Sequence, residues 1–85
     1  MSQVLYTFSS SHTAMEAELL FEEVGHPCRL IPLPSMISAG CGLALLCPAA
    51  SRGAVAGLLR QHQLQTEGLY AGAGKVWEEM RDDLP

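Results

Sequence analysis

The chain begins with alternating side chains and then changes to a helical repeat. In residues 4–8, VLYTF, the alternation puts Val4, Tyr6 and Phe8 on one face, which is typical of a strand. Apolar residues then recur every three or four positions over residues 12–24, until a glycine and a proline interrupt the pattern. The first 24 residues therefore predict a strand followed by a helix.

Two further apolar runs flank a loop in the middle of the chain. Residues 28–33, CRLIPL, predict a strand, and Pro32 favours an edge position because proline donates no ladder hydrogen bond. Residues 43–47, LALLC, form a short apolar run between a glycine and a proline, which indicates a central strand. We expect the two strands to pair as a hairpin.

The second half repeats the order of helix and strand. A helix is predicted from Ser51 to about residue 62, and residues 66–70 predict a last short strand. The order strand, helix, strand, strand, helix, strand predicts an α+β fold, the ferredoxin-like βαββαβ sandwich. In that fold two helices cover one face of a four-stranded antiparallel sheet, here within a domain of residues 1–70.

Residues 71–85 form a tail beyond this predicted domain. A Gly/Ala-rich hinge is followed by apolar residues that could line one face of a short C-terminal helix, docked on the sheet or on a second subunit. A frayed acidic tail is the alternative, and Trp77 favours docking. The apolar residues of the tail are Val76, Trp77, Met80 and Leu84.

Composition narrows the class of protein. The chain has 85 residues, 48% hydrophobic and 16% charged, as expected for one compact domain. A net charge of −4 disfavours nucleic-acid binding, and no apolar run reaches the roughly 18 residues of a membrane span. Three cysteines without C-x-x-C spacing favour free thiols in the cytoplasm. We expect no metal and no cofactor.

One cysteine, Cys41, lies between glycines in the loop ahead of the central strand. The predicted topology brings that loop to the same end of the sheet as the start of the first helix. Helix N-termini carry unpaired amides and partial positive charge, which lower the pKa of a nearby cysteine. Glycines on both sides allow positive φ, so that backbone amides can face the sulfur. The candidate binding residues are Gly40, Gly42, Ser9, Ser10, Ser11 and His12.

The pattern also allows a simpler role for each cysteine. A cysteine beside glycines is often a small hydrophobic residue in a turn, and C-G alone does not distinguish the two roles. Cys28 and Cys47 face each other if the hairpin is symmetric about its loop, since their numbers sum to 75. They are then either packing residues or a redox pair.

The loop has a recognisable motif. Residues 29–45, RLIPLPSMISAGCGLAL, contain P-x-P, then I-S-x-x-C-G, then an apolar strand, and TFSSSHTAMEAE at residues 7–18 precedes them. These features resemble the "putative selenium/sulfur carrier protein-like" family of small bacterial and archaeal proteins, from about residue 4 to residue 70. The family commonly has Arg and Glu at Ser35 and Met36, and serines at Ala39 and Gly40.

The resemblance implies that Cys41 accepts sulfur or selenium as a persulfide or selenide and passes it on. The partners would be a donor protein and an acceptor protein, and the chain would act as a carrier more than as a turnover enzyme. An interaction or dimerisation module, with cysteines that only pack, is the alternative from a different class.

Overall fold

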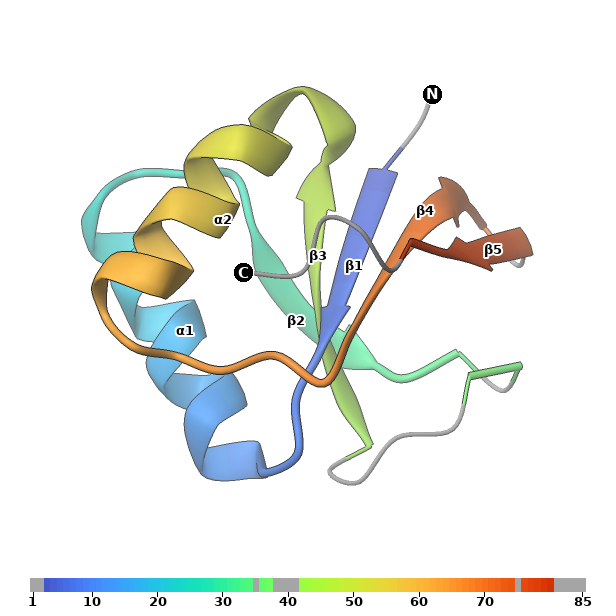
Figure 1. The fold of residues 1–85 in the computed structure, drawn as a ribbon, viewed down its shortest axis with the longest axis horizontal. Coiled ribbons are helices and arrows are strands. Elements are labelled where there is room, and N and C mark those ends of the chain that lie inside the picture. Colours follow the sequence, from blue (N-terminus) through green and yellow to red (C-terminus); the bar gives the residue numbers. More distant parts are fainter. Residues whose placement is uncertain (1–2, 35, 38–41, 75, 81–85) are drawn as a thin grey trace.

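The computed structural model describes residues 3–34, 36–37, 42–74 and 76–80 (Figure 1). Two helices and five strands form in it, with one short 3-10 turn before the second helix. In chain order they are β1 (Gln3–Thr7), α1 (Ser11–Glu23), β2 (Arg29–Pro32), β3 (Leu43–Pro48), η1 (Ala49–Ser51), α2 (Arg52–Gln61), β4 (Gly68–Ala73) and β5 (Val76–Glu79).

All five strands join one antiparallel sheet, in the order β2-β3-β1-β4-β5. The α+β class and the two helices are confirmed, whereas the expected count of four strands is wrong by one. β2 is an edge strand, as Pro32 predicted, and β3 is an interior strand flanked by β2 and β1. The predicted hairpin register is confirmed as well, with Leu30 opposite Leu45.

Both helices cover the same face of the sheet (Figure 1). The predicted alternation in β1 is confirmed, because Val4, Tyr6 and Phe8 are buried in the core beneath the helices. The helices contribute small and apolar side chains at helical spacing, which pack on this face. These are Ala14, Ala17 and Phe21 of α1 and Val55 and Leu59 of α2.

α1 ends where its sequence predicts. Gly25 has φ 75°, and its N–H donates to the carbonyl of Glu22, while the N–H of His26 donates to the carbonyl of Phe21. These two bonds form a Schellman motif, in which a left-handed residue satisfies the last free carbonyls of a helix. The chain therefore turns sharply toward β2.

A second apolar cluster occupies the face opposite the helices. It buries Leu5, Ala44 and Leu46 of the interior strands beneath Ile37 and Trp77. Ile37 belongs to the segment after β2, so this segment folds back over the sheet. Among the described residues, Leu33 and Ile37 of the loop after β2 and Trp77 of β5 thus pack on the face that the helices leave open.

The expected short C-terminal helix is wrong, because residues 76–79 form β5. β4 continues to Ala73, and Gly74 adopts φ 60°, which starts a tight turn back. Gly72 lacks a Cβ and allows the backbone at Val76 to approach closely. The Gly/Ala stretch therefore builds a hairpin where the sequence indicated a hinge. Leu84 lies outside the described residues.

No helix in the described ranges combines the length and the apolar character that crossing a bilayer requires.

Candidate functional site

The predicted serines lie at the N-terminus of α1. Ser10 is the N-cap residue, and its Oγ accepts a hydrogen bond from the Thr13 N–H at 3.2 Å and lies 3.0 Å from Thr13 Oγ1. Its hydroxyl therefore serves the helix itself. Ser9 and Ser11 are exposed. The first two amides of the helix, those of Ser11 and His12, precede the amide that Ser10 caps.

His12 extends along the helix. Its Nε2 lies 2.9 Å from Glu16 Oε1, one turn further on, and the His12 side chain is 85% exposed. Such exposed pairs at i,i+4 contribute little to stability. The imidazole therefore lies on the solvent side of α1 and contacts the Glu16 carboxylate, one turn further along the helix.

The loop that carries Cys41 is fixed on both sides by residues of its motif. Before it, Ile37 is buried and its N–H donates to the Pro34 carbonyl at 2.9 Å. After it, Gly42 adopts φ 71°, as predicted for a glycine here, and its carbonyl accepts from the Leu33 N–H at 3.0 Å. Cys41 and Gly40 themselves lie outside the described residues, with Ser38 and Ala39.

The sheet brings three chain segments to one end. Thr7, the last residue of β1, pairs with Ala44 of β3 and with Gly68 of β4. The chain leaving β1 toward α1 therefore runs beside the chain that enters β3 from Gly42. The segment from α2 enters β4 at this same end, where the Glu67 N–H donates to the Thr7 carbonyl at 2.7 Å.

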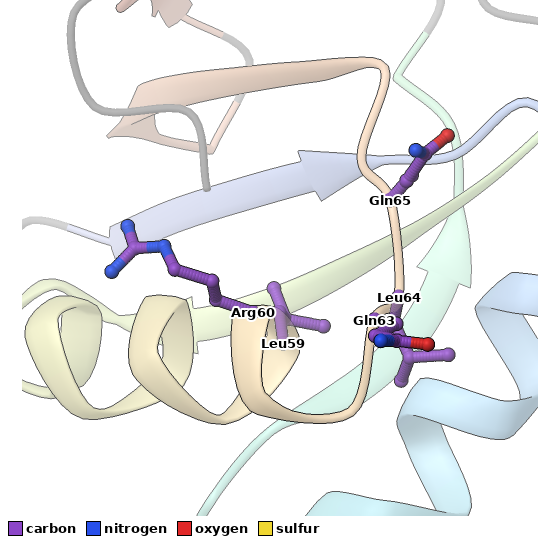
Figure 2. Close-up of a pocket in the computed structure, with 5 residues that line it drawn as sticks. All are labelled: Leu59, Arg60, Gln63, Leu64 and Gln65. Carbon is purple, nitrogen blue, oxygen red and sulfur yellow. The ribbon is translucent and has the colours of Figure 1, made fainter.

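A pocket of about 490 Å³ lies where α2 ends (Figure 2). Gln63 has φ 57° there and turns the chain away from the helix. Figure 2 shows Leu59, Gln63 and Leu64 close together at the helix end, while Arg60 points back along α2. The pocket is lined by Leu59, Arg60, Gln63, Leu64 and Gln65, so none of the predicted site residues belongs to it.

A second cysteine-containing site lies at the opposite end of β3. Cys28 and Cys47 are free thiols, and Cys28 packs against the apolar cluster that buries Cys47. A hydrogen bond with the Cys47 thiol lowers the pKa of Cys28, against the opposing effect of burial. For Cys47 the same bond raises the pKa, and burial raises it further. When the pair loses its first proton, Cys28 therefore becomes the thiolate and Cys47 stays protonated.

Sequence reasoning had placed Cys28 opposite Cys47 but could not assign the two thiols different acidities. The difference follows first from the direction of the hydrogen bond between them, and burial adds to it, because Cys47 is fully buried beneath the helices while Cys28 is only half-buried. Among the residues with described placement, no three His, Cys, Asp or Glu side chains gather closely enough to hold a metal ion.

Comparison with known proteins now identifies the family. A family model described as "Putative Se/S carrier protein-like" matches residues 3–71, which is most of the chain. The chain belongs to this family. No curated protein and no solved structure matches it. Within this Se/S carrier-like protein, the motif residues Pro34, Ile37 and Gly42 shape the two sides of the loop that contains Cys41.

Proposed function

We propose that this Se/S carrier-like protein carries sulfur or selenium on Cys41. The observation that carries the proposal is the loop itself: the matched family motif uses Ile37 and Gly42 to fix both sides of a four-residue segment that contains one cysteine. The short tether to a left-handed Gly42 also suits a backbone whose amides turn toward an anion.

The chemistry is a sulfur transfer between thiols. The Cys41 thiolate attacks the outer sulfur of a donor persulfide, R–S–SH, and a new S–S bond forms as the old one breaks. The electron pair of the broken bond leaves with the donor as RS⁻, and Cys41 holds the sulfur as Cys–S–SH. An acceptor thiolate removes it by the same step in reverse. The corresponding selenium species is Cys–S–SeH.

The end of the sheet at which β3 begins supports an anionic cysteine. The chain into α1 passes beside the chain from Gly42, so the first amides of the helix, those of Ser11 and His12, lie at this end of the sheet. Helix N-termini stabilise thiolates and persulfide anions by their partial positive charge. Ser9 and Ser11 supply exposed hydroxyl groups nearby in the sequence.

The proposal also includes a fold, a cellular compartment and two kinds of partner. The strand order β2-β3-β1-β4 and the βαββαβ connection favour a ferredoxin-like fold with β5 as an added edge strand. Persulfide chemistry requires reduced thiols, which favours the cytoplasm. Transfer in two directions requires a donor protein and an acceptor protein as partners.

The test isolates Cys41 from the other thiols. A Cys28→Ser/Cys47→Ser variant, in which Cys41 is the only cysteine, is incubated with glutathione persulfide, and its intact mass is measured. We expect the mass to increase by one sulfur atom, reversibly with dithiothreitol. The control also carries Cys41→Ser and should gain nothing. A folded variant that gains no sulfur and is alkylated no faster than free cysteine would contradict the carrier role. The alternative, an interaction or dimerisation module, would then be favoured.

A further inference from the structure

The position of Cys28 and Cys47 in the β2-β3 ladder is defined by its hydrogen bonds. The Leu33 N–H donates to the Gly42 carbonyl, which makes residues 33 and 42 a hydrogen-bonded pair. Hydrogen-bonded and non-hydrogen-bonded pairs alternate along an antiparallel ladder. Continued one residue beyond the Arg29–Leu46 pair, the same register sets Cys28 opposite Cys47, five positions from this pair and therefore at a non-hydrogen-bonded site. The Cys28 N–H accordingly donates to the His26 carbonyl at 2.8 Å and not across the ladder.

Non-hydrogen-bonded pairs bring side chains closest together. Their Cα atoms lie about 4.5 Å apart, within the range of about 4.4 to 6.8 Å that disulfides span. The side chains of an opposed pair lie on the same face of the sheet, and Cys28 accordingly packs against the buried cluster to which Cys47 belongs. A disulfide between them would therefore require little movement of the backbone.

The two thiols differ in access to solvent. Cys28 is half-buried and lines a pocket of about 380 Å³ with Pro27, Arg29 and Pro48 at the edge of the sheet. Cys47 is fully buried in the core beneath the helices. A small reagent can therefore reach Cys28 first, while Cys47 has no exposed surface for it to attack. This division of roles is that of an attacking and a resolving cysteine.

We propose that Cys28 and Cys47 form a redox-active dithiol that closes to a disulfide by exchange with a small disulfide, independently of Cys41. The Cys28 thiolate attacks R–S–S–R, forms Cys28–S–S–R and releases RS⁻. Cys47 then gives up its proton and attacks the Cys28 sulfur, which releases a second RS⁻. The protein loses two electrons and two protons, and the small disulfide takes up both and is reduced to two thiols.

The electrostatics of the pair support this order of events. The thiol of Cys47 donates its hydrogen to the sulfur of Cys28, which lowers the pKa of Cys28 and raises the thiolate fraction of the accessible cysteine. Cys47 remains protonated until Cys28 has reacted. Once Cys28 is a mixed disulfide it carries no negative charge, and the penalty that its charge imposed on ionising Cys47 disappears.

The test uses a Cys41→Ser variant of the full chain, equilibrated with reduced and oxidised glutathione at increasing oxidation. Trypsin cleaves after Arg29 and Arg52, so Cys28 lies in peptide 1–29 and Cys47 in peptide 30–52. The substitution matters because Cys41 shares the second peptide. We expect these two peptides to become linked as the buffer is oxidised, with unchanged far-UV circular dichroism, and to separate again with dithiothreitol.

Two further variants that also carry Cys41→Ser separate the attack by Cys28 from the closure of the disulfide by Cys47. With Cys47→Ala we expect Cys28 to accumulate as the mixed disulfide with glutathione, and with Cys28→Ser we expect Cys47 to stay unmodified while the chain is folded. The proposal is overturned if the Cys41→Ser variant shows no linked peptides in fully oxidised glutathione. Cys28 would then be found as a mixed disulfide with glutathione or as a free thiol. Because Cys41 is absent throughout, the result is independent of the carrier test.

Discussion

Replacement of Gly72 by alanine tests how β5 is held. A Cβ at this position would overlap the carbonyl oxygen of Val76 and lie 3.0 Å from its carbonyl carbon and 3.1 Å from the Cα of Trp77. These are backbone atoms, which cannot move aside as a flexible side chain can. The added methyl group must therefore displace β5 from β4.

The expected loss of stability has a lower and an upper limit. Overpacking with small adjustments costs about 1 to 3 kcal/mol. If β5 separates, the burial of Trp77 is lost, and a tryptophan buries about 150 to 250 Å², worth about 4 to 6 kcal/mol at 25 cal/mol per Å². A chain of this length has only about 4 to 13 kcal/mol of unfolding free energy, so the upper limit could abolish folding.

Urea denaturation followed by circular dichroism and by fluorescence measures both effects. Trp77 is the only tryptophan and is 7% exposed, so its emission reports directly on the position of β5. A loss of about 2 kcal/mol lowers the midpoint by about 1 to 2 M for an m-value of about 1 to 2 kcal/mol/M. We also expect the emission of Gly72→Ala to move to longer wavelength before the helices unfold.

The matched control is Gly57→Ala in α2, where no atom lies within 4 Å of the added Cβ. Alanine there should stabilise the chain by up to about 1 kcal/mol, because glycine is a poor helix former. If Gly72→Ala unfolds at the wild-type midpoint with unchanged emission, then β5 does not approach β4 as closely as described, and the explanation of the fifth strand is wrong.

Three other substitutions probe separate features. Ser10→Ala should lower the unfolding free energy by about 1 kcal/mol through loss of the N-cap, whereas Ser9→Ala should change it by less than about 0.5, as thermal denaturation can measure. Ile37→Ala should cost about 2 kcal/mol or more in urea denaturation, because it empties a buried position in the cluster opposite the helices. Cys47→Ala removes the hydrogen bond that lowers the pKa of Cys28 and leaves burial, which raises it. In a Cys41→Ser background, Cys28 should then be alkylated more slowly at neutral pH, with the pH–rate profile moved to higher pH; an unchanged profile would refute the assigned cause.

The sequence predicted those parts of the fold whose patterns are local. The alternation in β1, the glycine at the end of α1 and the position of Pro32 gave elements that the structure confirms. β5 was missed because Val76, Trp77 and Met80 fit a helical repeat as well as a strand. The close approach of Gly72 to the backbone of Val76 fits only the hairpin, and the period of the apolar residues does not reveal it.

At the candidate site, too, the sequence predicts the local features but not those that depend on packing. The positive φ of Gly42 follows from the residue type, and the adjacency of Cys28 and Cys47 follows from the hairpin register. The different acidities of these two thiols depend on which thiol donates the hydrogen bond between them and on how deeply each is buried, and only the packed structure determines both. The predicted roles of Cys41 and its neighbours stay predictions until the thiol is tested.

The strand pair β4-β5 has a practical consequence for fragments of this protein. The family match ends at residue 71, within β4, whereas Trp77 protects Leu5, Ala44 and Leu46 from beyond that boundary. A fragment trimmed to the matched residues would leave a shortened β4 with one unpaired edge beside a bare apolar surface, a combination that promotes aggregation.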